Sequence, residues 1–295
     1  MESEPENFHA GMIRPILQDA ALLADITLAR GAPDALHVWW LGQSGFLVQW
    51  QGRHLLFDPY LSDSLTHKYA TTNKPHVRMT ERVIAPELLD FIDVVTSSHN
   101  HTDHLDAETL GPLFRVNPGL QLVAPAANRS FICERLGRPP DDPAIQGLDD
   151  GTHLTVKIFT FTGLPAAHEN LDKDELGRHR YLGFLVKAGP WTIYHSGDTI
   201  DYPGLAARLK DAKVDLAFLP INGRAPERQV SGNLNGVEAA RLAHAAHIGL
   251  VVPCHYEMFE FNTASPADFV AECTRLDQRF HLMQAGEHLA WNPHE

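Results

Sequence analysis

The chain has 295 residues, a hydrophobic content of 44% and a formal net charge of −13 at pH 7. This length and apolar content predict a substantial core and exclude a disordered chain. The acidic charge excludes general binding of nucleic acid or anionic lipid, because both need a basic surface. A small-molecule substrate is therefore the expected partner, and homo-oligomer formation is left open.

Membrane and disulfide-rich classes are also disfavoured. The chain has no apolar run near the ~20 residues that a membrane helix needs, and the start MESEPENFHAGMIRP lacks the features of a signal peptide. We therefore expect a cytoplasmic protein without stable membrane association. The three cysteines Cys133, Cys254 and Cys273 are widely spaced and form no CxxC pair, which excludes a disulfide framework or a cysteine-rich zinc module.

The first half begins with an expected N-terminal helical segment, residues 1–35, whose helix lies within 12–29. Short apolar runs bounded by glycine or polar residues follow at 36–42, 45–50 and 53–59, and this pattern predicts strands. Residues 60–90 are polar and irregular. A connection this long inside a compact domain is more often a lid or binding loop than a spacer.

Strands and helices alternate through the rest of the chain. Strands are expected at 91–98, 121–126, 153–164, 181–189, 191–197, 215–220 and 250–255, and helices at 106–117, 127–137, 203–212 and 235–247, with Asp106 as an N-cap. This alternation predicts an α/β protein with sheet inside and helices outside. Because no linker or repeat interrupts it, residues 36–295 are expected to form a single domain.

The motif SHNHTDH, residues 98–104, places three histidines and one aspartate directly after an expected strand. Imidazole and carboxylate groups suit zinc and neighbouring divalent metals. Three later apolar runs also end on such a side chain, and the carboxyl ends of strands collect at one edge of a sheet. The pattern therefore predicts one site for a pair of metal ions. Its candidate ligands are His99, His101, Asp103, His104, His168, Asp198 and His255.

The order of these side chains resembles the metallo-β-lactamase-fold hydrolases, whose pattern is HxHxDH followed by single His, Asp and His positions. The similarity extends from about His37 to the C-terminus. Within that family, WWLGQSGFLV, FDPYLSDS, YHSGDT and PCHYEMF are most similar to the branch of ascorbate-6-phosphate lactonase, whereas SHNHTDHLD resembles the N-acylphosphatidylethanolamine phospholipase D branch. The resemblance implies a four-layer αββα sandwich.

The resemblance also implies how the ligands divide. One ion would be held by His99, His101 and His168, the other by Asp103, His104 and His255, and Asp198 would bridge the two. Asp58 matches a position from which an aspartate orients the ligand histidines, although a simple turn residue before Pro59 is the alternative. Zinc is the first choice of metal, and manganese or iron would suit the same ligands.

Two segments supply candidate substrate residues. The 60–90 loop carries several basic side chains, which would either bind a phosphate or carboxylate or simply be solvated. The glycine-flanked segment 220–236 follows an expected strand and should lie near the metal edge of the sheet. The candidates are Arg78, Asn222, Arg224, Arg228 and Asn233.

Two metal ions that share a water lower its pKa towards neutrality, so a metal-bound hydroxide can attack without a serine or cysteine nucleophile. Asp103 and Asp198 are the expected catalytic carboxylates, and Asp103 would move the proton. The preferred reaction is the opening of a lactone or related ester of a small anionic, sugar-derived substrate, phosphorylated or not. The alternatives are a phospholipase D-like phosphodiesterase and a metal-holding protein without catalytic activity.

Overall fold

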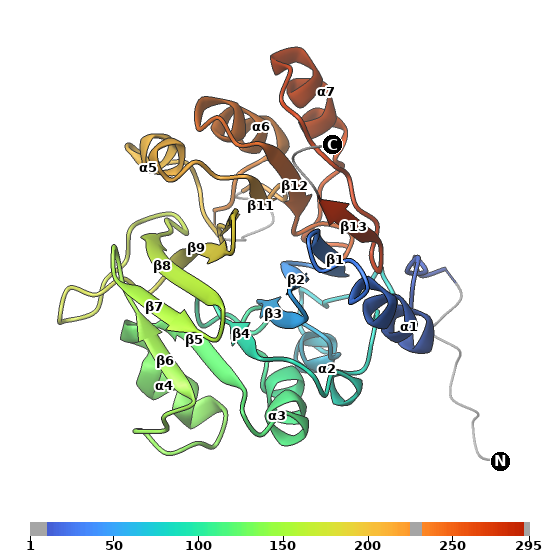
Figure 1. Ribbon diagram of the computed structural model, residues 1–295, viewed down its shortest axis with the longest axis vertical. Coiled ribbons are helices and arrows are strands. Elements are labelled where there is room, and N and C mark those ends of the chain that lie inside the picture. Colours follow the sequence, from blue (N-terminus) through green and yellow to red (C-terminus); the bar gives the residue numbers. More distant parts are fainter. Residues whose placement is uncertain (1–10, 225–231, 292–295) are drawn as a thin grey trace.

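The computed structural model describes residues 11–224 and 232–291 and contains two mixed β-sheets (Figure 1). The first has seven strands in the order β13-β1-β2-β3-β4-β5-β6, and the second has six in the order β12-β11-β10-β9-β8-β7. The strands of the first sheet are β1 (Leu36–Gly42), β2 (Gly45–Trp50), β3 (Arg53–Phe57), β4 (Val94–Thr96), β5 (Gln121–Pro125), β6 (Ile145–Leu148) and β13 (His288–Trp291). Those of the second are β7 (His153–Val156), β8 (Phe159–Pro165), β9 (Leu182–Ala188), β10 (Trp191–His195), β11 (Leu216–Pro220) and β12 (Leu250–Cys254).

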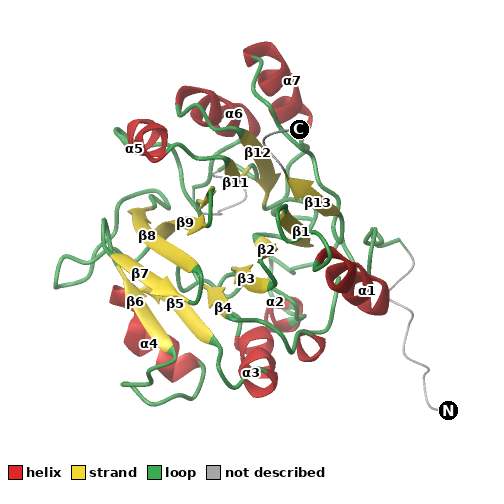
Figure 2. Cartoon of the chain, in the orientation of Figure 1, coloured by secondary structure: helices red, strands yellow, loops and turns green. Residues whose placement is uncertain are grey.

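Helices lie outside both sheets, as Figure 2 shows. The α-helices are α1 (Asp19–Ala29), α2 (Ser64–Tyr69), α3 (Ala107–Val116), α4 (Arg129–Arg135), α5 (Leu205–Ala212), α6 (Gly236–Ala245) and α7 (Ala267–Leu276), and two 3-10 helices are η1 (Pro86–Leu88) and η2 (Ala126–Asn128). Helices α1, α3 and α4 belong with the first sheet, and α5, α6 and α7 with the second. None of the helices within the described ranges is long and apolar enough to cross a membrane.

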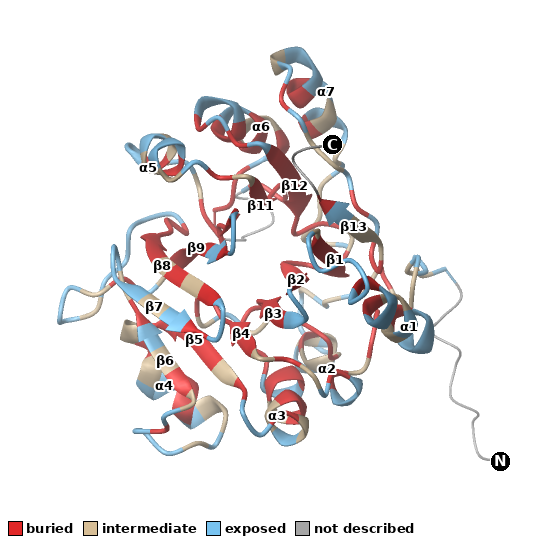
Figure 3. Cartoon of the chain, in the orientation of Figure 1, coloured by how far each residue is buried: buried red, intermediate tan, exposed pale blue. Residues whose placement is uncertain are grey.

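The core follows from the alternation of side chains along the strands of the first sheet. In β1, Val38 and Trp40 belong to the large core cluster that includes the second sheet. Their neighbours Trp39 and Leu41 belong instead to the cluster that holds the apolar faces of α1, α3 and α4. Because successive strand residues point to opposite faces, a strand buried on both sides reads as one continuous apolar run. Figure 3 shows the result, with buried strands inside and the exposed faces of the helices outside. The four-layer αββα sandwich is confirmed.

Most expected elements are present near their predicted bounds. Helix α3 begins after Asp106, whose side chain accepts a hydrogen bond from the Glu108 backbone N–H, as predicted for an N-cap. The expected single strand at 153–164 was wrong, because it is a hairpin in which Val156 pairs with Phe159. Lys157 turns the chain with a left-handed φ of 56°. No glycine or asparagine marks this turn, and the apolar Ile158 within it hid the break in the pattern.

The two segments expected to be irregular or helical also differ in detail. Residues 60–90 contain α2 and the short η1, so this connection has structure of its own. In the N-terminal segment the helix begins only at Asp19, while Ile13 forms a bridge with Thr80. Leu22 and Ile26 of α1 are fully buried against the first sheet. Pro15 and the backbone hydrogen bonds of Ile13 with Met79 and Glu81 keep the residues before Asp19 out of the helix.

Candidate metal centre

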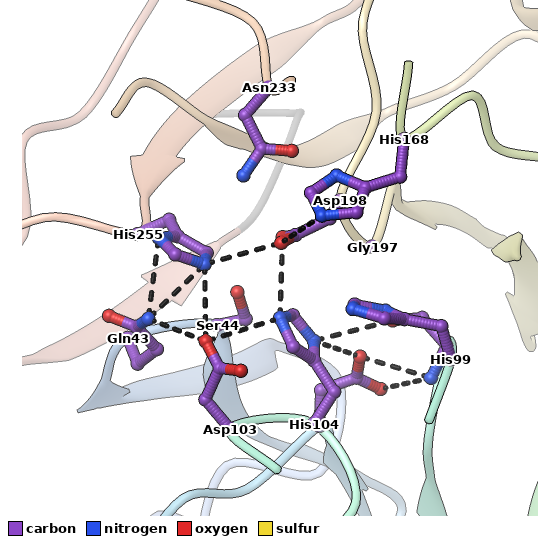
Figure 4. A network of polar contacts seen from close by, with 12 residues as sticks. Gln43, Ser44, His99, Asp103, His104, His168, Gly197, Asp198, Asn233 and His255 are labelled. Atoms are coloured by element: carbon purple, nitrogen blue, oxygen red, sulfur yellow. Dashed lines mark hydrogen bonds and ion pairs between the residues drawn. The ribbon is translucent and has the colours of Figure 1, made fainter. Parts of the chain in front are cut away.

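Four strand ends deliver the candidate ligands to one edge of the two sheets. The chain passes from β4 into His99, from β8 to His168, from β10 to Asp198, and from β12 directly into His255. His255 has a left-handed φ of 63°, so the chain turns sharply where the strand ends. Figure 4 shows these side chains converging from separate ribbons on one point. The predicted gathering of distant residues is therefore present in the fold.

The seven side chains form overlapping groups that have the spacing of a metal site. His99, His101 and His168 each offer a ligand atom, and these atoms lie within 4.8 Å of one another. The same holds for Asp103, His104 and His255, and for the set His99, His104 and Asp198. The carboxylate of Asp198 lies between the first two groups. Its Oδ2 is 4.0 Å from His168 Nε2 and 3.4 Å from His255 Nε2, and its Oδ1 is 3.3 Å from His104 Nε2.

Some polar atoms of this cluster make no hydrogen bond within the described part of the protein. Within the described residues, His99 Nε2, His104 Nε2 and Asp198 Oδ1 are buried and have no hydrogen bond, although His104 Nε2 and Asp198 Oδ1 face each other at 3.3 Å. Buried polar groups in proteins are nearly always paired, and each exception calls for an explanation. Imidazole nitrogens and a carboxylate oxygen are also the donor atoms that divalent first-row metals prefer. The residues present therefore fit a metal ion.

Asp58 fixes the orientation of His104, one of the candidate ligands, through a hydrogen bond with the ring nitrogen that faces away from the cluster. Its Oδ2 accepts a hydrogen bond of 2.8 Å from His104 Nδ1, which leaves Nε2 of that ring directed at the cluster. The same carboxylate accepts from the Ser98 backbone N–H and from the Thr96 hydroxyl. Both His104 and Asp58 are fully buried. A carboxylate in this position fixes the tautomer of a metal-binding histidine.

The electrostatics of the cluster favour positive charge. Burial would raise the pKa of Asp198, but His255 and His104 outweigh it and hold that pKa well below its usual range. Burial would likewise lower the pKa of His255, yet Asp198 and Asp103 raise it to about 9. Two ionised carboxylates thus draw protons onto neighbouring imidazoles. Divalent cations supply the same positive charge when they bind.

A polar side chain that sequence reasoning did not single out also joins this network. Gln43, in the turn between β1 and β2, donates a hydrogen bond of 2.8 Å from Nε2 to Asp103 Oδ2 and is fully buried. The only signal in the sequence is a long polar residue within the apolar strand pair LHVWWLGQSGFLVQW.

A cavity of about 420 Å³ opens above the cluster. Apart from Asp103 and Asp198, the charged side chains among its described lining residues are all basic: Lys68, Lys74 and Arg135. Tyr69, Phe259 and Phe261 form an apolar part of the wall, and asparagines form another part. An acidic protein therefore has a cationic mouth over its candidate metal centre.

The structure separates the candidate substrate residues into two groups. Asn222 and Asn233 line the cavity, and Asn233 Nδ2 donates to Asn222 Oδ1 at 2.9 Å. Arg224 is instead paired with Glu238 through two hydrogen bonds of 2.8 and 2.7 Å, so its charge is already neutralised. Arg228 lies outside the described residues.

Arg78 also lies away from the cavity. Its guanidinium donates to Asp63 Oδ1 at 2.7 Å and to the backbone carbonyl oxygens of Ser62 and Thr80. These contacts use the side chain to tie the 60–90 segment together, which the basic composition of that segment alone did not reveal. The lysines that do reach the cavity, Lys68 and Lys74, belong to the same segment.

Two neighbours of the ligands have structural roles. His195 contacts the Ser44 carbonyl oxygen through Nε2 at 2.8 Å, and its Nδ1 accepts from the Gly197 backbone N–H. Cys254 is buried in the core, where burial raises the pKa of its thiol well above the ordinary value. Neither residue belongs to the groups of candidate metal ligands.

Known proteins are similar in sequence to most of this chain. A metal-dependent hydrolase from Hyperthermus butylicus is 26% identical, with 85% of this chain and 97% of the relative covered. A metal-dependent hydrolase from Heliobacterium modesticaldum is 27% identical, with 88% and 99% covered.

Among the solved structures with the same fold, two are named for different reactions. The metallo-β-lactamase fold protein YhfI from Bacillus subtilis matches with a TM-score of 0.61 at 19% identity, covering 88% of this chain and 100% of that chain. The isothiocyanate hydrolase from Delia radicum gut bacteria matches with a TM-score of 0.67 at 19% identity, covering 86% and 99%. CmlA from Streptomyces venezuelae, a diiron β-hydroxylase, matches with a TM-score of 0.64 at 16% identity, covering 87% of this chain and 53% of the CmlA chain. The fold by itself therefore does not decide the reaction.

The family assignment rests on the sequence as a whole. The model of the β-lactamase superfamily domain matches residues 37–255, a span that runs from β1 through the last candidate ligand. The chain therefore belongs to the β-lactamase superfamily and has the metallo-β-lactamase fold.

Proposed function

We propose that the protein is a metal-dependent hydrolase with two divalent ions at the centre described above. One ion would be held by His99, His101 and His168. The other would be held by Asp103, His104 and His255, and Asp198 would contact both ions. The single observation that carries this proposal is the group of buried ligand atoms without hydrogen-bond partners among the described residues, gathered at the base of a cavity. Zinc is the first choice for so many imidazoles, with manganese or iron as alternatives.

The bound ions would supply a water of lowered pKa and polarise the oxygen under attack. The chain itself has to orient the substrate and move protons. We expect Asp103 to accept a proton at the cavity wall, because its carboxylate lines the cavity beside the proposed ions. The amides of Asn222 and Asn233 are placed to hold polar substrate oxygens.

The charge at the cavity mouth supports an anionic substrate. Lys68, Lys74 and Arg135 line the cavity of a protein whose net charge is −13, so these cations stand out locally. Lys68 is exposed, and its Nζ lies 5.0 Å from the centre of the Tyr69 ring. A carboxylate or phosphate on the substrate would be attracted to this rim while the scissile bond reaches the metal centre below.

We favour the opening of a lactone or related ester of a small sugar-derived acid or phosphate ester. The resemblance of WWLGQSGFLV and YHSGDT to the ascorbate-6-phosphate lactonase branch supports this reaction, and the cavity of about 420 Å³ suits a small polar molecule. Phosphodiester hydrolysis is the second candidate, because Asn100 of the phospholipase D-like motif lines the same cavity.

The test combines a metal count with turnover of generic substrates. We expect two ions per chain and hydrolysis of lactones by the metal-loaded protein. Hydrolysis of bis-p-nitrophenyl phosphate without lactone turnover would replace the lactonase reading with the phosphodiesterase one. A protein that binds metal and turns over neither substrate would overturn both and favour a non-catalytic, metal-holding role.

The anionic part of the proposal has its own test. Lys68→Met and Lys74→Met are expected to raise KM for a carboxylated lactone by about tenfold or more, since a hydrogen bond to a charged group contributes about 1.5–3 kcal/mol. KM for a neutral lactone should change little. Arg82→Met is the matched control, because this cation lies on the same segment but does not line the cavity. Equal effects on both lactones would contradict an anion-binding rim.

A further inference from the structure

The turn between β1 and β2 has a glutamine in a backbone conformation that long side chains rarely adopt. Gln43 has a left-handed φ of 50°. Glycine and asparagine are the residues that turns normally have in this conformation, because other side chains are sterically disfavoured there. The turn is nevertheless fully buried at Gln43 and almost so at Ser44. A long polar side chain at a buried, left-handed position indicates a role for the side chain itself.

The backbone of this turn is fixed from three sides. The carbonyl oxygen of Gln43 accepts hydrogen bonds of 3.0 Å from the His255 backbone N–H and from Trp40 Nε1. The carbonyl oxygen of Ser44 contacts His195 Nε2 at 2.8 Å. The turn therefore couples the end of β1 directly to His255, one of the proposed ligands, and leaves the Gln43 side chain a narrow choice of directions.

The side chain reaches two proposed ligands of the same ion (Figure 4). Gln43 Nε2 donates to Asp103 Oδ2 at 2.8 Å and lies 3.3 and 3.2 Å from Nδ1 and Nε2 of His255. Asp103 Oδ2 is itself 3.4 Å from His255 Nε2. Because Gln43 Nε2 is about equally near both ring nitrogens, it does not lie along the lone pair of either. The amide thus has one directed hydrogen bond, to Asp103 Oδ2, and lies against the His255 ring without a directed bond to either ring nitrogen.

We infer that Gln43 is a positioning residue for the ion held by Asp103, His104 and His255. Its amide holds Asp103 Oδ2 through one lone pair and leaves the other free for a cation, as hydrogen-bond donors to carboxylate ligands do. The amide is neutral, so it orients the carboxylate without competing with a cation for the site. On the other side of the cluster, the carbonyl oxygen of Gly232 contacts His168 Nδ1 at 2.9 Å in the same manner. The inference rests on the proposed metal centre.

Gln43→Asn is the informative variant. Asparagine suits a left-handed turn residue better than glutamine, so the folded protein should keep its thermal stability or gain some. Its side chain is one carbon shorter and cannot reach Asp103. We therefore expect an unchanged or higher Tm together with binding of one of two Co²⁺ ions that is about 10- to 100-fold weaker, and altered visible absorption of that ion.

The experiment is a Co²⁺ titration with chelator competition on the purified full chain. Gln49→Met is the matched control, because Gln49 is an equally buried glutamine on the adjoining strand and hydrogen-bonds His54, away from the cluster. Gln49→Met should bind both ions as the wild type does. Gln43→Met, which keeps the length of the side chain and lacks the donor, should reproduce the selective loss seen with asparagine.

The outcomes separate this inference from the proposal beneath it. Wild-type protein that binds no Co²⁺ would overturn the metal centre and the role of Gln43 together. If wild type binds two ions and Gln43→Asn binds them with the same affinities and spectrum, only the role of Gln43 is overturned. Weakening of both ions in step with a lower Tm would assign Gln43 to the fold alone and would also overturn the inference.

Discussion

Two clusters of histidine and aspartate in this molecule have opposite character. One is the candidate metal centre. The other joins α1 to the edge of the first sheet, where His288 Nδ1 contacts Asp25 Oδ2 at 2.8 Å and His288 Nε2 contacts His37 Nδ1 at 3.0 Å. His37 Nε2 contacts the Ala32 carbonyl oxygen at 2.9 Å, and Trp39 Nε1 donates to Asp25. We call the second group the α1 cluster.

The difference lies in which polar atoms have partners. In the α1 cluster every ring nitrogen of the two histidines faces a protein group. At the metal centre, His99 Nε2 has no hydrogen-bond partner among the described residues, and His104 Nε2 faces the carboxylate oxygens of Asp198 and Asp103 at 3.3 and 3.7 Å without a hydrogen bond. Buried nitrogens without a partner are uncommon in proteins, and in the described residues they also include the indole Nε1 atoms of Trp191 and Trp291. Histidine density therefore says little by itself, and several unpaired metal-binding atoms gathered at one point distinguish a ligand site from a structural network.

The strongest way to break this comparison is to remove a ligand. Asp198→Ala or His101→Ala is expected to lose bound metal and hydrolytic activity together, with activity falling on the order of a thousandfold because metal catalysis supplies several kcal/mol. Metal analysis and kcat/KM on the same samples provide the measurement. Full activity in a variant depleted of metal would show that the unpaired atoms serve some other purpose.

His54, a buried histidine outside the metal centre, should make the stability of the fold depend on pH and not on bound metal. Burial, assisted by Arg30, lowers the pKa of His54 to about 4, so its neutral form stabilises the folded state. This contribution is complete above the unfolded pKa near 6.5 and is lost as the pH falls towards 4, a loss of about 3 kcal/mol.

The measurement for His54 is urea unfolding at pH 7 and pH 4.5 in the presence of a chelator. His54→Leu should lose less stability between these two pH values than the wild type does. The variant also leaves Gln49 without its histidine partner, but that effect is the same at both pH values. An equal loss in both proteins would mean that His54 does not contribute to the acid sensitivity.

A residue that supports a ligand should have an intermediate effect. Asp58→Ala leaves His104 Nδ1 without its carboxylate, and we expect metal affinity to fall about 10- to 100-fold. Asp58→Asn retains an oxygen acceptor and should lose less. Chelator competition ranks the three proteins, and an unchanged affinity in Asp58→Ala would return Asp58 to the simpler role of a turn residue before Pro59.

The smallest effect is expected in the α1 cluster. Asp25→Ala removes the partner of Trp39 Nε1 and His288 Nδ1, and this should lower the free energy of unfolding by about 1–2 kcal/mol. Metal content and kcat/KM should match the wild type. A loss of metal in this variant would erase the distinction between the two clusters.

Local patterns in the sequence were sufficient for much of the fold. Strands buried on both faces are readable as apolar runs, and Asp106 marked the start of a helix correctly. The hairpin at Lys157 was not readable, because the turn depends on the pairing of Val156 with Phe159 and not on a turn-forming residue. The sequence also gave no signal that separates Arg78, held by Asp63, from Lys68, which lines the cavity. Both are basic residues of one polar segment.

The spacing of the HxHxDH motif and the later His168, Asp198 and His255 determined that a metal centre was to be expected, because ligand chemistry depends on residue type and on strand ends that meet at one edge. Only the tertiary structure decided which other groups reach that centre. Gln43 lies 60 positions from Asp103 in the chain and contacts it at 2.8 Å. Arg224, by contrast, pairs with Glu238 on α6 and does not line the cavity. Such pairings depend on which strand ends and loops, distant in the sequence, meet in the folded chain, and residue order does not encode those meetings locally.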